Sequence, residues 1–77
     1  MKETAIDSTV TPLDKFTAPY GRDITLENVE YINDTRVLRI RIREGNRFTV
    51  MDINPETATR WAGVMNDWAE QALQHEE

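Results

Sequence analysis

Alternating side chains over residues 37–43 constrain the fold of this chain more than any other feature of the sequence. Aliphatic residues and arginines take turns there, so that each kind recurs at every second position. The aliphatic residues are Leu38, Ile40 and Ile42, and the arginines are Arg39, Arg41 and Arg43. A period of two is typical of an antiparallel strand with one buried and one wetter face. The chain must therefore build a sheet and cover one side of it.

A second strand follows at residues 47–53, after a short loop at residues 44–46. A three-residue loop pairs Ile40 with Val50 and brings Phe48 to the aliphatic side of the sheet. A two-residue turn instead places Phe48 opposite an arginine. We expect the three-residue loop, because its register buries the apolar side chains of both strands.

The strand before residue 37 shows a conflict between its two ends. A two-residue turn at Asn33-Asp34 pairs Val29 with Leu38. The same register, continued without interruption, puts Leu26 opposite an arginine. One extra residue in this strand returns Leu26 to the aliphatic side. The sequence therefore predicts a β-bulge at Glu27-Asn28.

Residues 55–74 carry the pattern of an amphipathic helix. Asn54 is a suitable N-cap, and Pro55 fits the first helical position. Apolar residues then recur at intervals of three and four. They are Ala58, Trp61, Ala62, Met65, Trp68, Ala69, Ala72 and Leu73. We expect Trp61 and Trp68 to lie in the core, against the aliphatic side of the sheet.

The N-terminal segment shows neither period. Its scattered threonines, prolines and glycine predict a flexible arm over residues 1–22, in which residues 13–20 can dock on the domain. Residues 23–77 then form a single domain. The predicted fold class is α+β, a three-stranded antiparallel β-meander with one C-terminal α-helix packed on one face and a disordered N-terminal arm. Its strands are expected at residues 23–32, 35–43 and 47–53.

Composition argues against catalysis. The 77 residues include no Cys and one His. His75 lies near the end of the chain, and Ser8 lies in the predicted arm with no histidine near it, so neither indicates a catalytic site. The carboxylates lack the spacing of a metal-binding loop, and no glycine-rich phosphate loop is present. We expect a protein that is not an enzyme and binds no cofactor or metal.

The formal net charge of −5 disfavours non-specific binding to nucleic acid or anionic membranes. Acidic residues stand near the N-terminus, where a signal peptide needs an apolar run. No apolar stretch approaches the length of a membrane span. We expect the cytoplasm as the compartment and no association with a membrane.

Positive charge nevertheless concentrates on one strand. The five arginines of residues 36–47 outweigh Glu44, so that this segment carries +4. Guanidinium groups at every second position can grip phosphates or acidic side chains. The candidate partner-binding residues are Arg39, Arg41, Arg43, Arg47 and Met51. The alternatives are pairing of the arginines within the chain, by Asp23, Glu27, Asp52 or the arm, an acidic protein partner, and nucleic acid. Nucleic acid is disfavoured because paired exposed aromatic residues are missing.

Three segments resemble a group of short uncharacterised bacterial proteins, over about residues 14–73. They are Asp14-Lys15-Phe16 with Pro19-Tyr20-Gly21-Arg22, Leu38-Arg39-Ile40-Arg41-Ile42-Arg43-Glu44-Gly45, and Phe48-Thr49-Val50-Met51-Asp52-Ile53. The resemblance implies a domain of unknown function and brings no activity, ligand or site residue.

These observations favour a small cytoplasmic accessory or protein-interaction module without catalytic activity. The alternative is nucleic-acid or anion binding through Arg39, Arg41 and Arg43. So short a domain leaves apolar surface uncovered, notably at Met51, Ile53 and Val64, once its core is filled. The cover is either the arm, through Leu13, Phe16 and Tyr20, or a second copy of the chain. We favour an arm-capped monomer over a homodimer.

Overall fold

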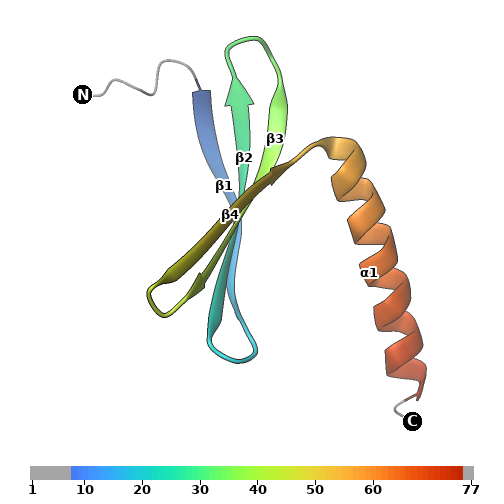
Figure 1. Cartoon of the computed structure of the whole chain (residues 1–77). Coiled ribbons are helices and arrows are strands. Elements are labelled where there is room, and N and C mark those ends of the chain that lie inside the picture. Colours follow the sequence, from blue (N-terminus) through green and yellow to red (C-terminus); the bar gives the residue numbers. More distant parts are fainter. Residues whose placement is uncertain (1–7, 76–77) are drawn as a thin grey trace.

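The computed structural model describes residues 8–75, which form four β-strands followed by one α-helix. The strands are β1 (Ser8–Ala18), β2 (Arg22–Tyr31), β3 (Arg36–Glu44) and β4 (Arg47–Ile53), and the helix is α1 (Pro55–His75). The strands make one antiparallel sheet in the order β1-β2-β3-β4 (Figure 1). The α+β class, the antiparallel meander and the C-terminal helix are confirmed. The expected number of three strands is wrong, because the sheet has four.

The additional strand, β1, lies in the segment for which the sequence predicts a flexible arm. It pairs with β2 along its whole length, and residues 1–7 of the predicted arm lie outside the described residues. The alternation of β1 is hidden because Leu13 is an extra residue that shifts the register. The shift allows Val10 to pair with Val29 and Phe16 with Ile24, although the two pairs face opposite sides of the sheet.

The β-bulge therefore lies in β1, and the bulge predicted at Glu27-Asn28 is wrong. Strand β2 pairs with β3 in one continuous register, in which Leu26 lies opposite Ile40 as expected. In the same register Val29 lies opposite Val37, on the other side of the sheet. The apolar residues at the two ends of β2 therefore do have opposite parity, as the sequence indicates. They do so because this strand places apolar side chains on both faces of the sheet.

The loop between β2 and β3 makes this continuous register possible. It is one residue longer than the predicted two-residue turn at Asn33-Asp34, because Tyr31 and Thr35 are its closing pair. The Tyr31 N–H donates to the Thr35 carbonyl at 2.8 Å, and Asp34 takes a left-handed φ of 70°. The Asn33 Oδ1 accepts a 3.1 Å hydrogen bond from the Thr35 N–H. Asparagine and aspartate tolerate such turns because their side chains bond the local backbone.

The loop between β3 and β4 is one residue shorter than predicted. Gly45 and Asn46 form a two-residue turn, and the φ of 59° at Gly45 is the one that a type II′ turn needs at its first central position. Ile40 consequently lies opposite Met51, and Phe48 lies opposite Arg43. The expected burial of Phe48 and Val50 against the helix is wrong, since both point to the side of the arginines.

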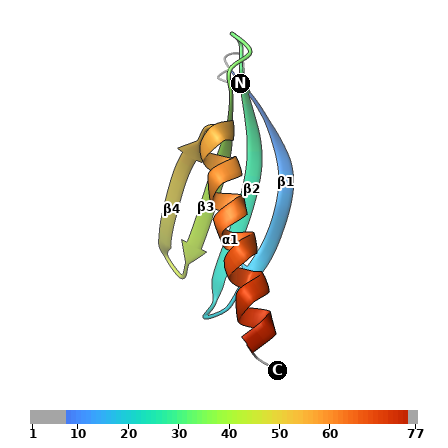
Figure 2. The same cartoon turned by 90° about the vertical axis from the view of Figure 1, so that its right-hand side faces the viewer.

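Helix α1 begins and ends where the sequence predicts, to within one residue. Asn54 caps it, because its Oδ1 accepts a 2.8 Å hydrogen bond from the Thr57 N–H. Glu56 lies in the first turn, where a negative charge favours the positive end of the helix dipole. The helix lies in front of one face of the sheet, which we call the cleft side (Figure 2). The opposite face, which carries Arg39, Arg41 and Arg43, is the arginine side.

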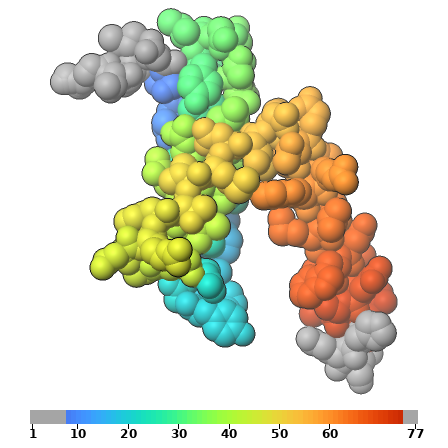
Figure 3. All heavy atoms as spheres, viewed as in Figure 1, coloured from blue at the N-terminus to red at the C-terminus, as the bar shows by residue number. Residues whose placement is uncertain are grey.

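Little of this chain is buried. Within residues 8–74 the only buried hydrophobic side chains are Val29 and Ile53, which are 1% and 8% exposed. Trp61 and Trp68, which we expected in the core, are 40% and 70% exposed. The helix approaches β3 near its start and then diverges from the sheet, so that a hollow opens between them (Figure 3). The helix thus lies on one face of the sheet as predicted, but the expected burial of Trp61 and Trp68 in a core between them is wrong.

Candidate apolar docking cleft

The hollow between α1 and the sheet is lined almost entirely by apolar side chains. Its narrow end is a cavity of about 260 Å³. Leu26, Leu38, Ile40 and Ile53 line it from the sheet and the end of β4, and Ala58, Trp61, Ala62 and Met65 line it from the helix. We call this space, with its continuation along α1, the apolar cleft. No ion pair crosses it within the described residues, so its chemistry is that of a hydrophobic docking surface.

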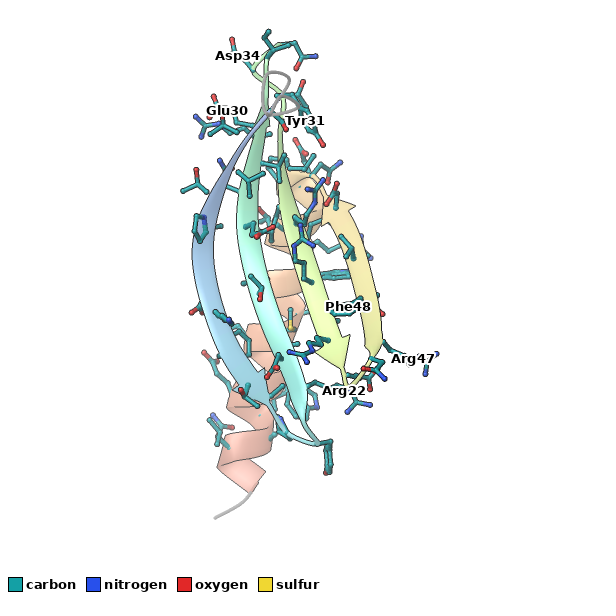
Figure 4. All side chains as sticks on the ribbon, turned by 90° about the vertical axis from the view of Figure 1, so that its left-hand side faces the viewer. Arg22, Glu30, Tyr31, Asp34, Arg47 and Phe48 are labelled. Carbon is teal, nitrogen blue, oxygen red and sulfur yellow. The ribbon has the colours of Figure 1, made fainter. Side chains whose placement is uncertain are left out.

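The sheet wall of the cleft is apolar in the middle and charged at both ends. At one end Arg22 and Glu44 form an ion pair of 2.6 Å, and at the other Arg36 lies 3.6 Å from Glu30. Figure 4 shows Arg22 and Glu30 at these opposite ends of the sheet. Between the pairs, the cleft side of β2 and β3 presents the aliphatic residues Ile24, Leu26, Leu38, Ile40 and Ile42, with Asn28 as the one polar residue among them. An apolar centre within a polar rim is the usual anatomy of a protein–protein interface.

The helix wall is wider than contact with one sheet requires. At about 100° per residue, the apolar positions of α1 cover roughly half of its circumference. Trp61 and Met65 belong to the cleft, and Val64 extends the apolar surface around the helix. A second hollow of about 470 Å³ lies there, against Arg60, Trp61, Val64 and Met65. Trp68 continues this wall and is 70% exposed.

The arginine side of the sheet is mostly paired within the chain. The Arg39 guanidinium donates to both carboxylate oxygens of Asp52, at 2.8 and 3.0 Å. The Arg41 Nε donates to Glu27 Oε1 at 3.0 Å. Two of the three guanidinium groups thus already hold carboxylates, as one of the sequence alternatives expects. Such bidentate and charge-assisted bonds order the side chains and leave them less able to grip a phosphate.

The five candidate partner-binding residues do not form one surface. Arg39, Arg41 and Arg43 lie on the arginine side, whereas Arg47 and Met51 lie on the cleft side. The Arg43 Nε donates to the Gly45 carbonyl at 3.2 Å, and its guanidinium lies 6.0 Å from the centre of the Phe48 ring. This distance is at the limit of a cation–π contact. Figure 4 shows Phe48 and Arg47 toward the same end of the sheet.

Around Arg43 the arginine side also forms a shallow hollow of about 170 Å³. Lys15, Arg41 and Arg43 contribute positive charge, and Asp23 contributes one negative charge. The Asp23 carboxylate also accepts a 3.1 Å hydrogen bond from the Thr17 hydroxyl. This hollow is smaller than most ligand pockets, which are about 300–1,000 Å³.

The hydrogen bonds from Arg39 hold the pKa of the Asp52 carboxyl below its ordinary value, and burial opposes them only in part. A carboxyl whose pKa is lower in the folded state stabilises the fold above its unfolded pKa, and that contribution is lost as the pH falls through the folded value. Both side chains are partly exposed, so we expect about 0.5–1 kcal/mol from this pair.

The pair therefore predicts an acid-sensitive component of stability. Between pH 6 and pH 2.5, the free energy of unfolding should fall less in Asp52→Asn than in the unaltered protein, by about 0.5–1 kcal/mol. Urea unfolding followed by circular dichroism at the two pH values measures the difference. Arg39→Gln should flatten the profile in the same way, because it removes the donor that lowers the pKa. A steeper profile in either variant would contradict this assignment.

The sequence did not single out the apolar cleft as a site. Its lining residues read as ordinary core positions, because the apolar period of the helix predicts only that this face is covered. Two signals could have pointed to the cleft. The apolar stripe of α1 is broader than one sheet needs, and residues 38–42 place aliphatic side chains where the short chain has little left to cover them.

Residues 8–75 contain neither a metal-binding group of side chains nor a membrane-spanning helix. No group of three or more His, Cys, Asp or Glu residues in this part of the chain could hold a metal ion. No helix among the same residues is both long and apolar enough to cross a membrane.

A four-stranded antiparallel meander that ends in one long, weakly packed helix, with an apolar cleft between them, defines a small α+β protein with an open hydrophobic face. A family model matches residues 7–71, and the chain belongs to that family, a family of unknown function (DUF6967). Searches of curated proteins and of solved structures found no match.

Proposed function

We propose that the protein is an accessory, protein-interaction module without catalytic activity, and that the apolar cleft is its binding surface. The cleft walls are two preformed elements, α1 and the cleft side of the sheet, which another protein chain can enter. Binding there buries apolar surface from both walls at once, which is the main favourable term in most protein association.

One observation carries this proposal. Of the eight apolar residues that line the cleft from the sheet and the helix, Ile53 alone is buried, although the two walls face one another. Contiguous apolar patches larger than a few hundred Å² are rare on soluble monomers and mark interaction sites. The polar rim, at the Arg22–Glu44 and Arg36–Glu30 pairs, bounds the patch at both ends of the sheet.

Binding of nucleic acid or another anion through the arginine side is less well supported. Such binding draws its affinity from free cationic groups that replace counterions on phosphates. Asp52 and Glu27 already neutralise Arg39 and Arg41. Release of these carboxylates would have to accompany every contact with a phosphate, and the net charge of the chain opposes the approach.

The cytoplasm is the compartment that we propose. A chain without cysteine needs no disulfide and suits a reducing environment, and the open hydrophobic face suits a protein that assembles with its partner where it is made.

Site-specific photo-crosslinking in the source cell tests the proposed function. A photoreactive amino acid at Met65, on the cleft wall, should give a single adduct of defined mass. The same group at Gln74, on the side of α1 opposite the apolar surface, is the matched control and should give none. Absence of an adduct at Met65, or equal adducts at the two positions, would count against the cleft as a binding surface.

A further inference from the structure

We propose that the occupant of the apolar cleft is a second copy of this chain, so that the protein is a homodimer whose common core is formed by two sheets and two helices. This inference rests on the proposed function and names its partner. Because the copies are identical, the same cleft and the same helix face of each copy enter the interface.

The accessible surface of the single chain is the first argument. It is 6402 Å² for a mass of 9.0 kDa. The scaling law for folded monomers gives about 4,900 Å² at this mass. The excess is about 1,500 Å² per chain, or about 3,000 Å² for two chains. Obligate homodimers bury about 2,000–5,000 Å² in total, so the excess matches the area that such a dimer buries.

The shape of the chain leads to the same conclusion. Its radius of gyration is 15.6 Å, and its principal extents are 54, 30 and 15 Å. A compact domain of this length has a radius of about 12 Å, and one of twice the length has about 15 Å. The radius of gyration of a single copy therefore equals that of a compact dimer. The reason is that α1 diverges from the sheet and leaves room between them (Figures 1 and 3).

Within residues 8–75 no other segment of the chain lies in the cleft. Residues 13–20 were the candidates to cap it, but residues 13–18 are part of β1, and Leu13, Phe16 and Tyr20 are all exposed. The residues outside the described part are 1–7 and 76–77, and Met1 and Ile6 are the only large apolar residues among them. Two such side chains cannot cover a helix face that carries Trp61, Val64, Met65, Trp68 and Leu73.

The breadth of the apolar surface on α1 explains how one helix can serve two chains. Ala58, Trp61, Ala62 and Met65 contact or face the sheet of the same copy at the narrow end of the cleft. Val64 and Trp68 lie further around and along the helix, where the same copy offers no cover. A helix that is apolar over about half of its circumference is typical of burial on more than one side.

Sedimentation equilibrium of the full chain is the first test, and we expect twice the chain mass at micromolar concentration. Trp68→Glu should give a monomer, because it places a carboxylate in the interface. Gln74→Glu adds the same charge on the side of α1 opposite the apolar surface and should leave the dimer intact. A folded monomer in the unaltered protein up to several hundred micromolar overturns the inference. So does equal assembly of both variants.

Cysteine labelling keeps the inference testable even if Trp68→Glu fails to fold. The chain has no Cys, so each introduced thiol is unique. Met65 and Gln74 are both exposed in the single chain. We expect a maleimide to label Met65→Cys about tenfold more slowly than Gln74→Cys in the assembled protein, because the interface covers Met65. Equal rates in a dimer would place its interface elsewhere and overturn the inference.

Failure of this inference differs from failure of the proposed function. A monomer that still gives a Met65 photo-adduct of some other mass contradicts the second copy and leaves the cleft as a protein-binding surface. A monomer that unfolds cooperatively and gives no adduct contradicts both.

Discussion

Unfolding of the protein will depend on its own concentration. The single chain buries only Val29 and Ile53 fully, so most of its hydrophobic stabilisation must come from the partner copy. For a dimer that unfolds to two separate chains, each tenfold dilution lowers the apparent free energy of unfolding by about 1.4 kcal per mole of dimer. A hundredfold dilution should therefore lower the urea midpoint by on the order of 1 M. Circular dichroism at about 1 and 100 µM chain gives this comparison.

The same pair of urea unfolding curves distinguishes a dimer from a monomer without a measurement of mass. A monomer shows one midpoint at both concentrations, because the unfolding equilibrium then has the same number of molecules on each side. Arg41→Ala, which removes an ion pair on the arginine side, is a useful companion variant. It should shift both midpoints by the same small amount and preserve their separation. A concentration-independent midpoint in the unaltered chain would contradict an obligate dimer.

The secondary structure of the C-terminal two thirds of the chain was predictable because its signals are local. Asn54 and Pro55 mark the start of α1, and the alternation about Ile40 marks β3. Strand β1 was not predictable in the same way. The extra residue Leu13 breaks its period of two, so that Val10 and Phe16 fall in the same parity in sequence but face opposite sides in the sheet.

The pairing of β3 with β4 was mispredicted for a different reason. The three-residue loop was preferred because it buried Phe48 and Val50, on the assumption that a single chain covers its own apolar residues. The structure instead uses the tight turn at Gly45, and it leaves both side chains exposed on the arginine side. Turn chemistry at Gly45 therefore outweighs burial within one copy. The candidate site was missed for the same reason, because its lining residues were assumed to be covered within one chain.

The largest single-residue effect is expected at the centre of the cleft side. Ile40→Asp places a carboxylate between Leu26 and Met51, among the apolar side chains on the cleft side of the sheet. Neither neighbour can donate a hydrogen bond to it. Burial of an unpaired polar or charged group, together with the lost apolar contact, should cost about 4 kcal/mol or more. A loss of that size in a small domain leaves most of the chain unfolded.

Val50→Asp is the matched control, because it makes the same kind of change on the adjacent strand but on the opposite face. Val50 is 49% exposed and lies directly opposite Arg41, so the new carboxylate meets water and a guanidinium group. Val50→Asp should lower the free energy of unfolding by no more than about 0.5 kcal/mol, and cross-strand pairing with Arg41 can offset this loss. Urea unfolding of both variants at one protein concentration gives the comparison. If Val50→Asp proved the more damaging, the two-residue turn at Gly45-Asn46 and the assignment of faces that follows from it would both be wrong.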